Sequence, residues 1–214
     1  MNITKLSTYL TANFKGKFNQ EKYGITPAYN HRKEYTYLDK TESTDEWQKE
    51  VYEYAQNFML KNNYKKVVDF GCGSGFKMMK YFQNFESVGV EVEETYKFLV
   101  ENHPDQKWYN ADKLNTEILE TDLVICADVI EHVLNPDEFL DSLNKIKFKH
   151  LIISTPDRLT LHGSFHFGPP KNPFHIREWT CREFRKYLSK YYRIELQQIT
   201  NFNQATQMVV CTKK

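Results

Sequence analysis

A glycine-rich loop between an apolar strand and a helix is the feature that most restricts the fold of this chain. The stretch Val67–Met79 reads VVDFGCGSGFKMM, with glycines at positions 71, 73 and 75. Its apolar run predicts a strand over KKVVDFG, and FKMMKYF predicts a helix. Strand, glycine loop and helix in this order are typical of doubly wound parallel sheets, whose ligands bind at the carboxyl ends of the strands. The stretch therefore predicts an α/β fold and the place of its site.

Strands and helices alternate along the rest of the chain. Residues 94–102 predict a helix that is stopped by Pro104, and Asn135 and Pro136 have the positions of a cap and a first turn in a helix that runs to about Phe148. The last two apolar segments predict a closing antiparallel pair. The strands predicted after the glycine loop are SVGVEV, KWYNAD, DLVICAD and HLIISTP, and the closing pair is RIELQQIT and QMVVCTK.

Two capping boxes mark further helix starts. Ser43 and Glu46 have the spacing of a capping box at the start of an amphipathic helix that precedes the glycine loop. Thr180 and Glu183 have the same spacing before CREFRKYLSK. We therefore expect one helix to begin at each of these pairs.

Length and composition favour one domain with an appendage. Residues 1–40 show no clear period and predict an N-terminal cap or lid, whereas residues 41–214 form the main domain. The 29 basic and 28 acidic residues give a net charge of +1 without a single-sign block, which argues against a nucleic-acid partner. Scattered cysteines, and the absence of a long apolar segment or a signal-like start, predict a cytoplasmic protein without a membrane span. An oligomeric state is not indicated.

The glycine loop differs from a dinucleotide fingerprint at one position. Phe76 stands where that fingerprint has its third glycine, which lets helix and strand pack closely beside a pyrophosphate. Asp69, at the end of the strand, would repel a phosphate and attract an ammonium group. The N–H groups of the loop and of the helix start can receive a carboxylate. The segment therefore favours a ligand that carries both an ammonium and a carboxylate group.

Polar residues follow the next two predicted strands. Glu91 ends the second strand about 20 residues after the first loop glycine, where doubly wound folds place the acid that binds ribose hydroxyls. Asp112, after the third strand, can accept a hydrogen bond from an adenine amino group, with Asn110 and Ala111 beside the ring. Taken singly, Glu91 and Asp112 are also ordinary charges at strand ends. Together with the glycine loop, such features at successive strand ends indicate one nucleoside-type site.

This pattern resembles the class I S-adenosylmethionine-dependent methyltransferases over roughly residues 45–213. VVDFGCGSG resembles their first motif, Glu91 their second-strand acid, and ICADVIEHV their fourth-strand motif. The resemblance implies a Rossmann-like, seven-stranded, mostly parallel sheet with an antiparallel carboxyl-terminal hairpin, and S-adenosyl-L-methionine as cofactor. The cofactor-binding residues that it implies are Asp69, Gly71, Cys72, Gly73, Gly75, Glu91, Val92, Asn110, Ala111, Asp112, Ala127, Asp128, Val129 and His132.

The segment ADVIEHV places Asp128, Glu131 and His132 at the rim where the activated methyl group is expected. His132 is a candidate general base because the ordinary histidine pKa lies near neutral; the alternative is that it caps the turn or stacks on adenine. The three side chains could also hold a divalent cation, as in some ubiquinone-pathway O-methyltransferases with a similar turn. A fourth ligand is missing from the sequence pattern, so no metal is predicted.

The segment after the fifth strand, residues 156–179, is much longer than the ordinary connection of about 2–6 residues. His162 and His166 have helical metal-ligand spacing, but the glycines and prolines around them argue against a helix. Arg177 could simply pair with its neighbour Glu178. Alternatively, the segment presents an imidazole, a guanidinium and an indole face to a polar ring. The predicted substrate-binding residues are His166, His175, Arg177, Glu178 and Trp179, and the predicted catalytic residues are Asp128, His132, His175 and Arg177.

The combination of ISTPDR and GPPKNPFHIREWT resembles a branch of methyltransferases associated with the modification of sugars and cell-surface glycans. It implies O-methylation of a sugar, a nucleotide-linked sugar or a glycan terminus. The first alternative is a small phenolic or quinone-precursor acceptor, which the VIEHV turn favours. A non-catalytic binding protein is the second alternative, and methylation of RNA stays open without support from the charge pattern.

Overall fold

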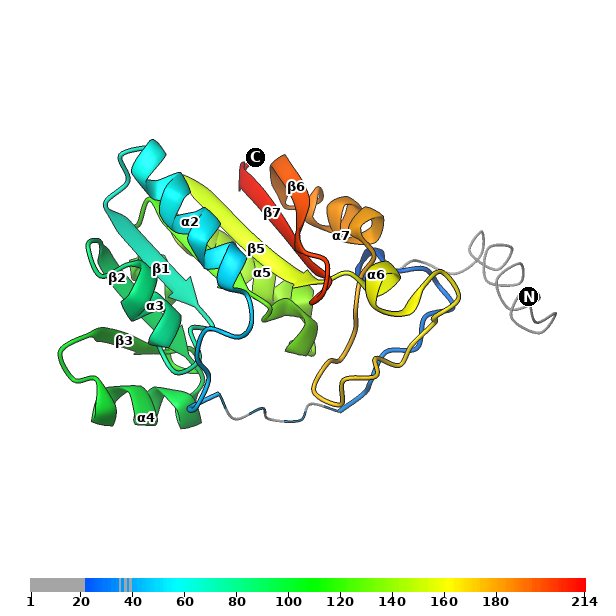
Figure 1. Cartoon of the computed structure of the whole chain (residues 1–214), viewed down its shortest axis with the longest axis horizontal. Helices are drawn as coiled ribbons and strands as arrows, with labels where there is room; N and C mark the ends of the chain where they lie inside the picture. The colour runs from blue at the N-terminus through cyan, green and yellow to red at the C-terminus, as the bar shows by residue number, and fades with distance from the viewer. Residues whose placement is uncertain (1–21, 35, 37, 39) are drawn as a thin grey trace.

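The computed structural model describes residues 22–34, 36, 38 and 40–214 (Figure 1). Its centre is a seven-stranded sheet with the order β3-β2-β1-β4-β5-β7-β6. All neighbouring pairs up to β5 are parallel, and β7 is antiparallel to both β5 and β6. The predicted fold class is therefore confirmed. The strands are β1 Lys66–Phe70, β2 Glu86–Glu91, β3 Lys107–Asn110, β4 Leu123–Ala127, β5 His150–Pro156, β6 Tyr192–Asn201 and β7 Thr206–Lys213.

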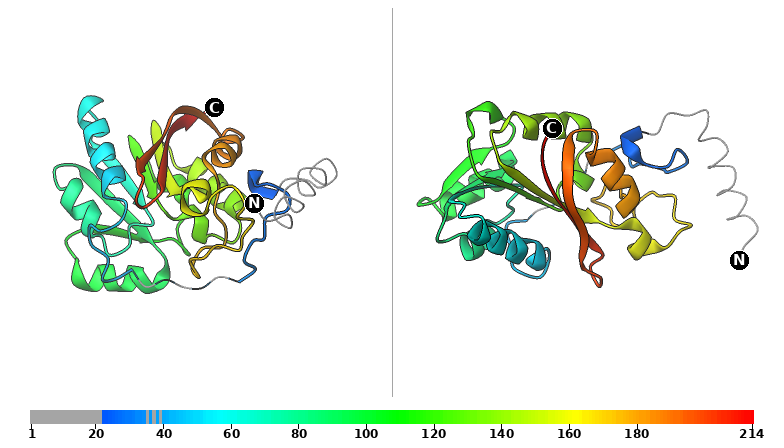
Figure 2. Two further views of the ribbon diagram at one scale, coloured as in Figure 1. Left: turned by 45° about the vertical axis from the view of Figure 1, so that its right-hand side comes forward. Right: turned by 90° about the horizontal axis from the view of Figure 1, so that it is seen from above.

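Helices cover both faces of the sheet (Figure 2). Leu123 and Ile125 of β4 pack into the apolar cluster that includes α2, α3 and α4, while Val124 and Cys126 pack with α5 and α7 on the other face. A strand that is buried on both faces explains the uninterrupted apolar run of LVICA. The helices are α2 Lys49–Lys61, α3 Phe76–Tyr81, α4 Glu93–Asn102, α5 Pro136–Lys145, α6 Arg158–His162 and α7 Cys181–Leu188, and the 3₁₀ turns are η1 Lys22–Gly24, η2 Thr116–Ile118 and η3 Ile130–His132.

The two predicted capping boxes have different outcomes. Thr180 and Glu183 form the complete reciprocal capping box at the start of α7. The box predicted at Ser43 is wrong, since α2 begins at Lys49 after Gln48, which has a left-handed backbone and no side-chain cap. Ser43 instead accepts a hydrogen bond through its carbonyl from the Ser74 hydroxyl of the glycine loop. The residues before α2 are therefore held by the ligand loop instead of starting the helix.

Residues 22–34 lie against the carboxyl-terminal half of the domain (Figure 1). The N–H of Asn30 donates to the Phe167 carbonyl, and the N–H of Arg32 donates to the Ile176 carbonyl. Thr26 donates to Glu183 through its N–H at 3.0 Å and its hydroxyl at 2.7 Å. The division into a cap over residues 1–40 and a domain over residues 41–214 stays a prediction, and residues 1–21 lie outside the described residues. Among the described residues, no helix is both long and apolar enough to cross a membrane.

Candidate active site

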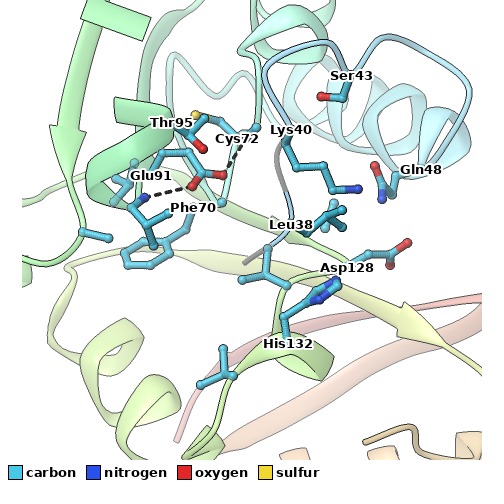
Figure 3. Close-up of a pocket in the computed structure, with 18 of the residues that line it drawn as sticks. Leu38, Lys40, Ser43, Gln48, Phe70, Cys72, Glu91, Thr95, Asp128 and His132 are labelled. Atoms are coloured by element: carbon cyan, nitrogen blue, oxygen red, sulfur yellow. Dashed lines mark hydrogen bonds between the residues drawn. The ribbon is translucent and has the colours of Figure 1, made fainter. Parts of the chain in front are cut away.

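A cavity of about 560 Å³ opens at the carboxyl ends of β1, β2 and β4. Its walls come from the glycine loop, from the ends of β2 and β4, and from the segment of residues 40–48, which crosses the opening (Figure 3). The predicted cofactor residues that line it are Gly71, Cys72, Gly73, Glu91, Val92, Ala111, Asp112, Ala127, Asp128, Val129 and His132. The structure thus brings together residues from four strand ends in one site.

The backbone of the glycine loop requires residues without a side chain. Gly71 and Gly75 have φ angles of 86° and 74°, in the left-handed region that favours glycine. A Cβ atom on Gly71 would lie 2.3 Å from a methyl carbon of Val129, and one on Gly75 would lie 2.6 Å from the Trp108 ring. Close packing against β3 and the β4 turn therefore fixes these two positions, although Gly75 does not line the cavity.

Glu91 is the acid that closes β2, and it faces the loop. One carboxylate oxygen accepts the Gly73 N–H at 2.9 Å, and the other accepts the Val92 N–H at 2.9 Å. Burial raises the pKa of this carboxyl, while the two N–H donors oppose the rise. Each carboxylate oxygen has lone pairs for a second hydrogen bond, so Glu91 can also accept hydroxyl donors in the cavity.

Asp69 does not line the cavity, which corrects the expectation that it meets an ammonium group directly. Its carboxylate is fully buried and accepts bonds from the Tyr52 hydroxyl at 2.9 and 3.1 Å. Burial raises the pKa of Asp69 to about 7. Tyr52 of α2 lines the cavity instead. The sequence did not indicate this residue, because a tyrosine at helical spacing reads as ordinary core.

The segment after β3 forms a tight turn beside the cavity. Asn110 lies outside the lining; its amide oxygen accepts the Asp112 N–H at 2.9 Å, and its amide nitrogen donates to Glu93. Asp112 accepts the Glu93 N–H at 3.1 Å. Ala111 and Asp112 themselves line the cavity. Asn110 therefore shapes the turn that carries the two lining residues.

The β4 turn places Asp128 and His132 on the cavity wall. Asp128 has a left-handed φ of 51° and accepts the Ser154 hydroxyl at 2.6 Å. Nδ1 of His132 donates to the Phe174 carbonyl at 2.9 Å, which leaves Nε2 without a proton. Burial, and next the charge of His175, lower the pKa of His132 to about 3. The near-neutral pKa that suggested His132 as a general base is therefore not present here.

Glu131, His132 and His175 form a cluster whose ligand atoms all lie within 4.8 Å of one another. The imidazole rings of His132 and His175 meet edge to face at 4.8 Å between centroids. Oε2 of Glu131 accepts the Thr155 hydroxyl at 3.0 Å, but its buried Oε1 has no partner. Burial, and next the charge of Asp128, raise the pKa of Glu131 well above its usual range.

Carboxylate oxygens and imidazole nitrogens in this arrangement fit a divalent cation. A cation would give the unpartnered Glu131 Oε1 a partner. It would also offset the repulsion between the carboxylates of Glu131 and Asp128. His175 is a ligand that the sequence pattern lacked, and Asp128 is not among the three residues of this cluster. The N–H of Ile176 donates to the Glu131 carbonyl at 2.8 Å, so the loop after β5 folds back over the β4 turn.

None of the predicted substrate residues, His175 included, lines the cavity. Arg177 is buried and donates through its guanidinium to the Val133 and Leu134 carbonyls. Trp179 is fully buried and stacks on Tyr187 at 5.9 Å between ring centroids. The expectation that the indole presents a flat face to a substrate is therefore wrong, because core residues cover it.

Glu178 does not pair with Arg177. Its carboxylate accepts bonds from His175 Nδ1 at 2.8 Å and from His162 Nε2 at 3.1 Å. His166 lies beside His162, with ring centroids 4.2 Å apart. The helix α6 ends at His162, before Gly163 with φ 75°, so the two histidines do not share a helix. His162, His166 and Glu178 therefore lie together, and Glu178 links them to His175.

The segment of residues 40–48 adds lining residues that the sequence did not indicate. Lys40 extends between Glu91 and Asp128, and Gln48 lies opposite Glu91 (Figure 3). The ammonium group of Lys40 acts to lower the pKa of both acids, against the larger effect of their burial. Trp47 also lines the cavity and is 57% exposed. Nothing in the spacing of these residues marked them as part of a site.

Solved structures with the same fold include several methyltransferases. The methyltransferase domain of bacterial CtHen1-CN is 23% identical with a TM-score of 0.58, over 77% of this chain and 98% of that one. The small RNA methyltransferase HEN1 is 21% identical with a TM-score of 0.59, over 85% of this chain and 27% of that one. Magnesium protoporphyrin IX methyltransferase from Synechocystis PCC 6803, with bound SAH, is 14% identical with a TM-score of 0.59, over 100% and 96%.

No curated protein matches this chain in sequence. Residues 40–206, which contain every strand of the sheet up to the start of β7, match the family described as "Methyltransferase domain". The cavity, the glycine loop and Glu91 agree with S-adenosyl-L-methionine as the cofactor. The chain belongs to the methyltransferase domain family and is an S-adenosylmethionine-dependent methyltransferase.

Proposed function

We propose that this protein methylates a hydroxyl group of a sugar that carries two adjacent hydroxyls, with a divalent cation at Glu131, His132 and His175. The observation that carries the proposal is this cluster, with its buried and unpartnered Glu131 oxygen, next to the cavity wall. A bound cation would coordinate a hydroxyl oxygen of the acceptor and favour loss of its proton. An adjacent hydroxyl pair can supply two ligands at once.

Some residues of the site bind the methyl donor, and others bind the acceptor. Glu91 and the glycine loop hold the nucleoside and amino-acid ends of the donor, and Tyr52 and Lys40 line the space between them and Asp128. The acceptor oxygen forms a bond to the methyl carbon while the carbon–sulfur bond breaks, and the proton that the hydroxyl loses passes to solvent water. Orientation of the two reactants can supply about 7–11 kcal/mol of the barrier reduction. His132 stays neutral and serves as a ligand, since its low pKa makes it a weak base.

Three acceptor types carry such a hydroxyl pair, and the structure supports them differently. A glycan terminus or nucleotide-linked sugar agrees with the resemblance of residues 156–179, and the ribose at an RNA end agrees with the RNA methyltransferase among the similar folds. A catechol-type phenol is the third candidate, because the exposed side chains of Trp47 and Leu134 form apolar parts of the cavity lining. Net charge of +1 favours a short terminal acceptor over a long nucleic acid.

A methyl-transfer assay with isotope-labelled donor tests the proposal. The acceptors are nucleotide sugars, short RNAs with an intact or a deoxy terminal ribose, and catechols, each with Mg²⁺, Mn²⁺ or a chelator. We expect transfer to one sugar class, loss of transfer with the chelator, and at least a 100-fold loss in Glu131→Gln. Glu117→Gln, at an exposed acid outside the site, is the matched control. Transfer that survives both the chelator and Glu131→Gln would refute the cation; exclusive transfer to catechols would refute the sugar.

A further inference from the structure

A second group of potential metal ligands adjoins the cluster of Glu131, His132 and His175, and the methyltransferase site does not use it. His162, His166 and Glu178 each offer a ligand atom, and these atoms all lie within 4.8 Å of one another. His162 comes from the end of α6, His166 from the loop that follows, and Glu178 from the far end of the same loop. The group thus joins the two ends of residues 156–179.

The hydrogen bonding of this group is incomplete. Nδ1 of His162 and Nδ1 of His166 are buried and have no partner, and they are the only histidine nitrogens of the described residues in that condition. A buried polar atom without a partner costs about 1–3 kcal/mol. The two rings lie with centroids 4.2 Å apart, and the open Nδ1 of His166 indicates that a further ligand completes the group.

The distances suit a small cation with nitrogen ligands. In a tetrahedral zinc site with Zn–N bonds of about 2.0–2.1 Å, adjacent ligand atoms lie about 3.3 Å apart. Nε2 of His162 and Oε2 of Glu178 lie 3.1 Å apart in their hydrogen bond, so a cation that replaced the Nε2 proton would find both atoms near this separation. Two imidazoles and one carboxylate are a ligand set that zinc prefers, whereas Mg²⁺ prefers oxygen. We propose that His162, His166 and Glu178 bind a zinc-type cation, separate from the cation of the active site.

This second cation would act on the active site through Glu178. Oε1 of Glu178 accepts the Nδ1 proton of His175, so Nε2 is the nitrogen without a proton, and a metal that bound it would displace the Asn172 amide. Nε2 of His175 accepts a bond from the Asn172 amide at 2.9 Å. The side chain of Glu178 is 1% exposed and cannot turn away. The second site therefore holds residues 156–179 together and orients His175, without contact with donor or acceptor.

Zinc counting on the full chain tests this proposal. The protein is stripped with a chelator, dialysed, titrated with Zn²⁺ and measured by elemental analysis. The variant Glu131→Gln/His132→Asn lacks two ligands of the first cluster, and we expect it to retain one equivalent of zinc. Addition of His166→Asn should reduce this to none. His103→Asn, which removes a histidine outside both clusters, should retain the equivalent.

Cobalt spectra supply a second readout. Co²⁺ bound to Glu131→Gln/His132→Asn should show the intense visible absorption of a tetrahedral site, and Zn²⁺ should displace it one to one. This measurement needs no His166 variant, so it stands if that variant does not fold. Zinc binding that persists after His166→Asn, or a first-cluster variant that binds neither zinc nor cobalt, would overturn the second site. Methyl transfer is not measured in either experiment, so the proposed function can fail independently.

Discussion

The buried Asp69–Tyr52 pair makes the stability of the protein depend on pH in a way that one substitution can isolate. Burial raises the pKa of Asp69 from 3.8 to about 7 in the folded protein. The unfolded chain releases this proton near pH 4, whereas the folded chain keeps it until about pH 7. Because the folded state binds more protons in this window, stability is full below pH 4 and falls as the pH rises toward 7.

The pKa of Asp69 is shifted by about 3 units, and each unit is worth about 1.4 kcal/mol. The free energy of unfolding of the wild type should therefore fall by about 4 kcal/mol between pH 4 and pH 8 because of this carboxyl. Asp69→Asn keeps an acceptor for the Tyr52 hydroxyl and removes the titration. In urea unfolding without cofactor, the variant should therefore gain about 4 kcal/mol relative to wild type between these pH values. The exposed Asp105→Asn should show no such gain. Parallel pH profiles of Asp69→Asn and wild type would refute the reasoning.

Three further substitutions test the site. Gly71→Ala should abolish binding of S-adenosylhomocysteine in calorimetry, because its Cβ would lie 2.3 Å from Val129; Gly163→Ala, also at positive φ but with open space around it, should bind normally. Glu91→Gln removes charge-assisted bonds of about 1.5–3 kcal/mol and should weaken this binding about 10–100-fold, and unchanged affinity would contradict its role. Arg177→Ala should spare cofactor affinity, lower turnover, and lower the thermal midpoint, because it removes the bonds to the Val133 and Leu134 carbonyls; a loss of cofactor affinity instead would contradict the assignment of Arg177 to the acceptor side.

The centre of the sheet was predictable because its strands are local apolar runs with turn residues after them. LVICA and HLIISTP are buried on both faces and could be identified without their neighbours. The box at Thr180 was equally local, since both partners lie within one helical turn. Ser43 has the same spacing, but its partner is Ser74 of the glycine loop. A spacing rule cannot detect such a competing contact from a distant segment.

The residues that bind the donor were predictable because they lie at strand ends. Those on the acceptor side were not, because they meet through contacts between distant segments. Glu91 and the glycines lie at strand ends whose positions the fold dictates. His175 meets His132 only because a loop folds back over β4, and Trp179 is covered by α7 and by residues before α2. Contacts of that kind join distant segments and leave no period in the sequence.

The loop after β5 is held at several points along its length and has one short exposed tip at residues 163–165. Asp157 and Trp179 form a parallel bridge at its base, and the N–H of Ile176 is bonded to the Glu131 carbonyl. Between these ties, Gly163 has open space on its side-chain position, and residues 163–165 are exposed. Insertions or replacements at this tip would leave the frame and the donor site undisturbed. A longer loop could therefore be grafted at this tip without a change to the half of the site that holds the methyl donor.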